Sequence, residues 1–126
     1  MNWIISLIFA LFIGFVVSRL LPVRGLRNLT EPEIMTMLNN NQHDHEFIDV
    51  REGIEYRSGY IPGFKNIPLT QLSSRLHEIE KSRIVVLTCH RGMRSRQAAR
   101  VLRKHGYPTL CHLETGVSGW RGLLVK

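Results

Sequence analysis

The sequence predicts an α/β domain with an open, mostly parallel sheet flanked by helices, preceded by one apolar helix. Short apolar runs alternate with segments of helical periodicity after residue 29. The run at 84–88 is β-branched, which is typical of strands buried on both faces. Residues 3–18 contain no charged side chain, which predicts the N-terminal helix. A chain of 126 residues has room for one ordinary domain.

Residues 1–21 are expected to form a transmembrane anchor. The apolar stretch approaches the roughly 17–25 residues of a membrane span, and Trp3 suits a bilayer interface. Arg19, Arg24 and Arg27 follow it, so the positive-inside rule predicts a single-pass protein of a bacterial plasma membrane with its domain on the cytoplasmic side. A signal peptide cleaved near Val16-Val17-Ser18 is an alternative, although no basic region precedes Trp3. A buried core helix is a second alternative, which the apolarity on all faces disfavours.

The first half of the remaining chain predicts a linker, a helix and a strand. Residues 22–28 are expected to be a basic linker, and 29–126 the domain. Thr30 is the expected N-cap of a helix, with Glu33 as its capping-box partner, and three asparagines at 39–41 end it. An apolar strand follows at 47–50. Glycine and proline then mark turns at 59–63, before an extended stretch at 66–68.

The second half predicts two further strands, each preceded by a helix. Leu72, Leu76 and Ile79 form one face of a helix at 70–81. The remaining elements are a strand at 84–88, a helix at 95–105 that ends before Gly106, a strand at 109–113 and a short helical turn at 116–120.

The charge and cysteine content limit the classes of partner. A net charge of +7 suits nucleic acid, an anionic membrane or an anionic substrate. The arginines gather after the apolar segment and around Cys89, and no nucleic-acid module accompanies them, so no nucleic-acid partner is expected. Two cysteines make no disulfide framework, and free thiols fit a reducing compartment. Cys111, in an apolar strand, is interpreted as a small buried hydrophobe, with a resolving thiol as the alternative.

The loop after residue 88 combines the features that activate a nucleophilic thiol. A strand ends at Thr88 and a helix begins near Ser95, and ligands of open α/β sheets bind at the carboxyl ends of strands. Backbone N–H groups and a helix N-terminus would favour the thiolate, which is the reactive form. An inert thiol beside solvated arginines is the alternative. The sequence predicts Cys89 as the catalytic residue, and the substrate-binding loop is His90, Arg91, Gly92, Met93 and Arg94.

This loop resembles the active-site loop of the rhodanese family, Cys-Arg-x-Gly-x-Arg followed by Ser or Thr. Cys89, Gly92, Arg94 and Ser95 occupy the matching places, whereas His90 replaces the family's first arginine and an arginine follows one place later. Further matches in the family's order extend from about residue 29 to 122. These matches are Asp49-Val50-Arg51, Glu55-Tyr56, Gly59-Tyr60-Ile61-Pro62-Gly63, Asn66-Ile67-Pro68 and Gly116-Val117-Ser118-Gly119-Trp120.

The resemblance implies a thiosulfate or persulfide sulfurtransferase in which Cys89 carries sulfur between a small donor and a thiol acceptor. It implies supporting roles for Asp49, Arg51, Glu55 and Ser95, with Arg94 bracing the loop; which carboxylate pairs with which arginine stays open. No cofactor and no metal are expected, since the histidine-rich tract at 43–46 lies in a polar turn.

Two other functions are compatible with a cysteine at this position. One is a non-catalytic module that carries a persulfide or senses redox state for a membrane partner. The other is a phosphatase or arsenate reductase, whose loops resemble this one with an additional residue between cysteine and arginine. Four residues separate Cys89 from Arg94 here, which favours sulfur transfer. The physiological donor, acceptor and protein partner are not identified by the sequence.

Overall fold

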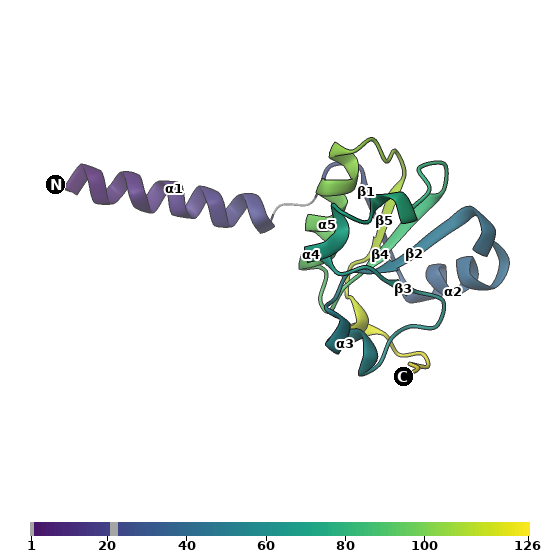
Figure 1. Ribbon diagram of the computed structural model, residues 1–126. Coiled ribbons are helices and arrows are strands. Elements are labelled where there is room, and N and C mark those ends of the chain that lie inside the picture. The colour runs from purple at the N-terminus through teal and green to yellow at the C-terminus, as the bar shows by residue number, and fades with distance from the viewer. Residues whose placement is uncertain (1, 21–22) are drawn as a thin grey trace.

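The computed structural model describes residues 2–20 and 23–126 and contains one five-stranded parallel sheet in the order β1-β5-β4-β2-β3 (Figure 1). This confirms the predicted α/β fold. The strands are β1 (Leu26–Leu29), β2 (His45–Asp49), β3 (Lys65–Asn66), β4 (Ile84–Thr88) and β5 (Leu110–Leu113). The α-helices are α1 (Asn2–Leu20), α2 (Glu31–Asn40), α3 (Gly53–Arg57), α4 (Leu69–Leu72) and α5 (Met93–Lys104), and the 3-10 turns are η1 (Gln42–Asp44), η2 (Leu76–Glu78) and η3 (Val117–Gly119).

The core has two parts, one on each face of the sheet. Successive side chains of a strand point to opposite faces, so Val85 and Leu87 of β4 join one cluster and Val86 joins the other. The first cluster includes Ala98 and Leu102 of α5, while the second includes residues from α2. The central strand is therefore covered on both sides, as its β-branched sequence predicts.

Helix α1 is confirmed as a helix and extends away from the domain (Figure 1). Its transmembrane role is not supported, because no helix among residues 2–20 and 23–126 is long and apolar enough to cross a membrane. The uncharged stretch at 3–18 has a length of about 24 Å at 1.5 Å per residue, against about 30 Å of bilayer hydrocarbon. Leu21 and Pro22, which end the predicted anchor and start the predicted linker, lie outside the described residues.

Strand β1 lies largely within the segment that was expected to be a linker. It runs parallel to β5, with Leu26 opposite Leu110 and Asn28 opposite His112. Four residues are too few for a clear alternation, and the strand forms because the edge of β5 supplies hydrogen-bond partners for its backbone. The ordered domain therefore begins before residue 29, which extends the predicted domain toward the N-terminus.

The helix predicted at 70–81 is interrupted. Only α4 and the 3-10 turn η2 form, separated by Ser73, Ser74 and Arg75. The Ser74 hydroxyl donates to the carbonyl of Gln71 at 2.9 Å, which is the local bonding by which serine competes with helix propagation. Leu72 and Ile79 are nevertheless buried, so the apolar pattern identified the buried side chains and misjudged the backbone.

Candidate active site

Cys89 follows β4 directly, at the carboxyl edge of the parallel sheet. Its neighbours in the sheet are β2 and β5, so the loop starts at the centre of the fold. The side chain is only 1% exposed and packs in the cluster that includes Ala98 and Leu102. The sulfur is therefore almost fully shielded from solvent.

A short turn brings the backbone back toward the sulfur. The Gly92 N–H donates to Cys89 Sγ at 2.9 Å, and α5 begins at the next residue. Gly92 has φ of +99°, a conformation that favours glycine, and a Cβ there would overlap the carbonyl oxygen of Glu114. The sulfur therefore faces a backbone donor and the N-terminus of a twelve-residue helix, both of which stabilise negative charge.

A second turn, at Gly116 and η3, holds the outer side of the loop. The Val117 N–H donates to the Cys89 carbonyl at 2.8 Å, and the Ser118 N–H to the His90 carbonyl at 3.0 Å. Gly116 has φ of +67°, and a Cβ at this position would overlap the carbonyl of His90. Because η3 binds these two carbonyl oxygens, they face away from the sulfur, and the closing glycine motif fixes the loop's orientation.

The structure pairs the four charged residues whose partners the sequence left open. Arg94 donates to both carboxylate oxygens of Glu55, at 2.5 and 2.9 Å, and these bonds lower the pKa of Glu55 to about 2. Arg51 binds Asp49, with a closest distance of 2.8 Å between Nη2 and Oδ2, and both side chains are buried. Arg94 thus joins α5 to α3 beside the loop, while the second pair lies inside the fold.

The buried pair also fixes the backbone between the sheet and α3. Arg51 Nη2 donates to the Gly59 carbonyl at 2.8 Å. The Asn66 side-chain amide donates to the carbonyls of Asp49 and Arg51, at 3.0 and 2.8 Å. Three of the motifs quoted from the sequence therefore meet in one hydrogen-bonded network that supports the loop and does not touch the sulfur.

The remaining loop residues lie at the surface. His90, Arg91 and Met93 are exposed, the last at 53%. Because Arg94 is already paired, Arg91 and His90 are the loop side chains best placed to meet an incoming anion. The structure thus gathers all ten predicted site residues around the loop or beneath it, although their roles in catalysis remain predictions.

Two polar residues that were not predicted from the sequence, His112 and Asn28, extend the site from Ser95 toward β1. Cys89 Sγ lies 3.6 Å from Ser95 Oγ, which lies 2.7 Å from His112 Nδ1. His112 Nε2 lies 2.8 Å from Asn28 Oδ1. His112 is fully buried, and this burial, with a smaller effect of Arg96, lowers its pKa to about 4. A lone histidine inside the apolar run at 109–113 was the available signal.

The other candidates from the sequence lie apart from the loop. Cys111 is a buried free thiol whose pKa is raised by burial, and Cys89 is likewise free. In the histidine-rich tract, His45 contacts the Asn41 carbonyl and Glu46 pairs with Arg83, so the side chains do not converge. Within the described part of the chain no three metal-binding side chains cluster.

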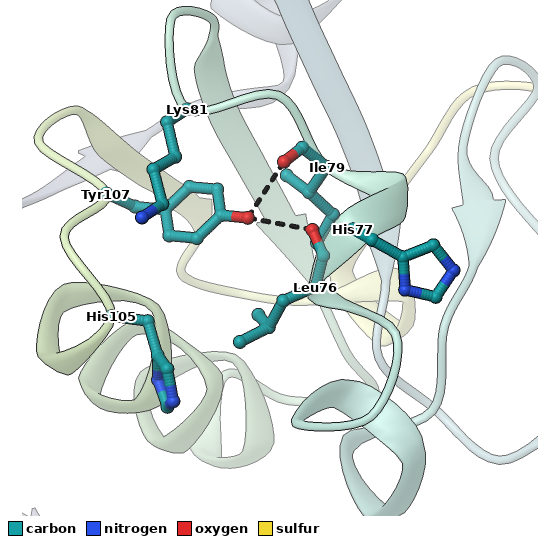
Figure 2. A pocket seen from close by; sticks show the side chains of 6 residues that line it. All are labelled: Leu76, His77, Ile79, Lys81, His105 and Tyr107. Carbon is teal, nitrogen blue, oxygen red and sulfur yellow. Dashed lines mark hydrogen bonds between the residues drawn. The ribbon is translucent and has the colours of Figure 1, made fainter.

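A hollow near Tyr107 lies at the opposite end of the sheet. Figure 2 shows the Tyr107 hydroxyl donating to the carbonyls of Leu76 and Ile79, both at 2.8 Å, with Lys81 over the ring. These residues precede β4 and β5, whereas Cys89 follows β4. The hollow is therefore at the amino ends of the strands and does not belong to the cysteine site.

Comparison with known proteins gives a consistent result. The family model of the rhodanese-like domain matches residues 30–123. The chain is 38% identical over 122 residues to the uncharacterized protein YqhL of Bacillus subtilis, covering 96% of this chain and 94% of that one. It is 31% identical to a sulfurtransferase of Allochromatium vinosum, covering 74% and 87%. A rhodanese-like domain protein of Staphylococcus aureus superposes with a TM-score of 0.68 at 27% identity, covering 80% and 99%.

Proposed function

The chain belongs to the rhodanese-like domain family, and from this premise we propose that it is a sulfurtransferase that carries sulfane sulfur as a persulfide on Cys89. The observation that carries the proposal is the Gly92 N–H at 2.9 Å from Cys89 Sγ, at the start of α5. A backbone donor and a helix N-terminus stabilise an anionic sulfur without any further cofactor. The sulfurtransferase among the relatives supports the same class of reaction.

The proposed reaction has two covalent steps. The Cys89 thiolate attacks the outer sulfur of a donor such as thiosulfate; the donor's S–S bond breaks, and sulfite leaves with the electron pair. The terminal sulfur of the new persulfide is anionic and lies among the loop amides. An acceptor thiolate then attacks this outer sulfur, the persulfide bond breaks, and Cys89 is returned as the thiolate while the acceptor becomes a persulfide.

The distribution of charge supports a small anionic donor. Arg94 is committed to Glu55, so Arg91, which is exposed, is the arginine available for the donor's sulfonate group. Cys89 is buried at 1% exposure, which suits transfer of a single sulfur atom better than attack on a bulky centre. The short segment between Cys89 and Arg94 supports sulfur transfer over chemistry on phosphate or arsenate.

The direct test is formation of thiocyanate from thiosulfate and cyanide by the detergent-solubilised full chain. We expect turnover by the wild type, none above background by Cys89→Ser, and wild-type turnover by Cys111→Ser, which removes the other buried thiol. A Cys89→Ser variant as active as the wild type would disprove the role of Cys89. A folded wild type without turnover, but with a persulfide on Cys89 by mass spectrometry, would support the non-catalytic carrier instead.

We further propose that α1 attaches the domain to a lipid bilayer, on the cytoplasmic side. Trp3, Ile5, Phe9 and Leu11 are each more than 60% exposed, and exposed apolar side chains on this scale favour a lipid or protein contact. Lipid is favoured because the apolar residues surround the helix instead of forming the single stripe of a protein-binding helix.

Flotation of the full chain with vesicles tests this attachment. We expect the wild type to float with vesicles, and Phe9→Asp to lose most of this binding, since a charged residue within the apolar helix is costly in a bilayer. Leu124→Asp, at an exposed residue of the domain, is the matched control and is expected to float as the wild type does. Equal flotation of all three proteins would contradict a role for α1.

A further inference from the structure

The buried side of Cys89 carries an unbroken row of polar contacts that leads by way of α5 and β5 to the edge strand β1. It runs from Cys89 Sγ to Ser95 Oγ at 3.6 Å, to His112 Nδ1 at 2.7 Å, and from His112 Nε2 to Asn28 Oδ1 at 2.8 Å. Ser95 and His112 are fully buried, whereas Asn28 is exposed on the edge strand. The row therefore connects a nearly inaccessible sulfur to the solvent side of β1.

The direction of these hydrogen bonds follows from the Asn28 oxygen. An amide oxygen only accepts, so His112 Nε2 carries the proton and Nδ1 of the neutral ring is the acceptor. Ser95 then donates its hydroxyl proton to Nδ1, although the Gly92 carbonyl at 3.0 Å is a competing acceptor. The oxygen of Ser95 is left with lone pairs that face the Cys89 thiol.

The strand pairing shows why Asn28 has this role. Asn28 lies directly opposite His112 in the parallel ladder of β1 and β5. Of the two side chains that contact His112 in this row, Ser95 is buried and Asn28 is exposed. Asn28 thus selects the tautomer of His112, as a second hydrogen bond does for histidines at reactive centres.

We propose that Asn28 and His112 are positioning residues for Cys89, acting through Ser95 to receive the thiol proton when the nucleophilic thiolate forms. The S–H bond breaks, its electron pair stays on sulfur, and the proton passes to Ser95 Oγ. The original proton of Ser95 moves at the same time to His112 Nδ1. The inference rests on the proposed function only in taking Cys89 as the nucleophile.

The environment of His112 favours the neutral imidazole, so the residue passes a proton on and does not retain it. Burial first, and then the positive charge of Arg96, lowers the pKa of His112 to about 4, so the imidazolium releases its Nε2 proton toward the exposed side at Asn28. The net change is Cys89 thiol to thiolate plus one proton in solvent, with His112 left protonated at Nδ1 in place of Nε2; a return of the proton from Nδ1 to Nε2 restores the starting tautomer. The donor, by contrast, approaches at His90 and Arg91, on the exposed part of the loop.

The alkylation rate of Cys89 as a function of pH tests the relay, with iodoacetamide as the probe and mass spectrometry of the Cys89 peptide as the readout. His112→Gln keeps an acceptor for Ser95 and a donor for Asn28, but its amide cannot carry a proton. We expect its rate at pH 7 to fall about tenfold, because general-base assistance contributes at least this much. Asn28→Ala, at an exposed position, is expected to lower the rate by a smaller factor.

His45→Gln is the matched control, since His45 is also buried in the sheet but contacts the Asn41 carbonyl, at the amino end of β2. We expect its profile to equal that of the wild type. Wild-type profiles for both His112→Gln and Asn28→Ala would overturn the proposal; if His112→Gln does not fold, Asn28→Ala alone decides it. Alkylation needs no sulfur donor, so the relay can fail while thiocyanate formation succeeds, and the reverse.

Discussion

At the scale of single residues, the two arginines of the loop differ in what they can do. Arg94 forms a two-point ion pair with Glu55, and planar pairs of this kind fix geometry as well as charge. Arg91 is exposed. The cysteine-to-arginine spacing that resembles the family's loop therefore corresponds to a brace between α5 and α3. Arg91, the arginine that departs from the family pattern, is the one that we propose meets the substrate.

Replacing Glu55 with glutamine tests the brace. We expect kcat/KM for sulfur transfer to fall about tenfold, because a loop that is less well positioned loses part of its orientation advantage. The pair is partly exposed, so the loss of unfolding free energy should stay near 1 kcal/mol or less. Turnover and thermal unfolding are the measurements.

Glu78→Gln is the control for Glu55→Gln. Glu78 also pairs with basic side chains, Arg75 and Lys65, and these bonds lower its pKa to about 2, but it lies in η2, away from the loop. We expect this variant to retain wild-type turnover. An equal loss in the two variants would mean that the effect is one of general stability, and the bracing role of Arg94 would be wrong.

At the scale of elements, the sequence predicted the strand that is recognisable from its buried residues. It did not predict the strand that depends on pairing with a distant part of the chain. The strand at 84–88 was found residue for residue, because a β-branched run buried on both faces leaves a strong pattern. The end of α5 was predicted to within one residue from Gly106, which adopts φ of +90°. Strand β1 was missed because it forms by pairing with β5, which lies more than eighty residues away in the chain.

The candidate site divides in the same way. The loop from Cys89 to Ser95 is contiguous, so its chemistry could be predicted from one stretch of sequence. The partner of each arginine could not be predicted from the sequence, because either carboxylate could pair with either arginine. The fold brings Arg94 to Glu55 and Arg51 to Asp49. His112 could not be assigned, because its contacts with Ser95 and Asn28 come from three separate elements that only the sheet brings together.

At the scale of the whole molecule, a buried neutral histidine couples the stability of the domain to pH. The ordinary pKa of histidine, 6.5, falls to about 4 for His112 in the folded chain, so the unfolded chain binds the extra proton first as the pH decreases. The stabilisation is complete above pH 6.5 and is lost progressively down to pH 4. Other titrating groups respond to pH as well, so only a comparison with a variant isolates this effect.

We therefore expect the free energy of unfolding to fall by about 2 kcal/mol more between pH 7 and pH 5 in the wild type than in His112→Gln, because proton linkage converts the pKa difference into stability. Urea titrations of both full-length proteins at the two pH values measure this difference. The glutamine variant should be the less stable one at pH 7, since neutral imidazole suits the site, and the gap should narrow at pH 5. Parallel pH dependences would show that His112 stays accessible to protons in the folded state, and both its burial and its use as a neutral acceptor would then be wrong.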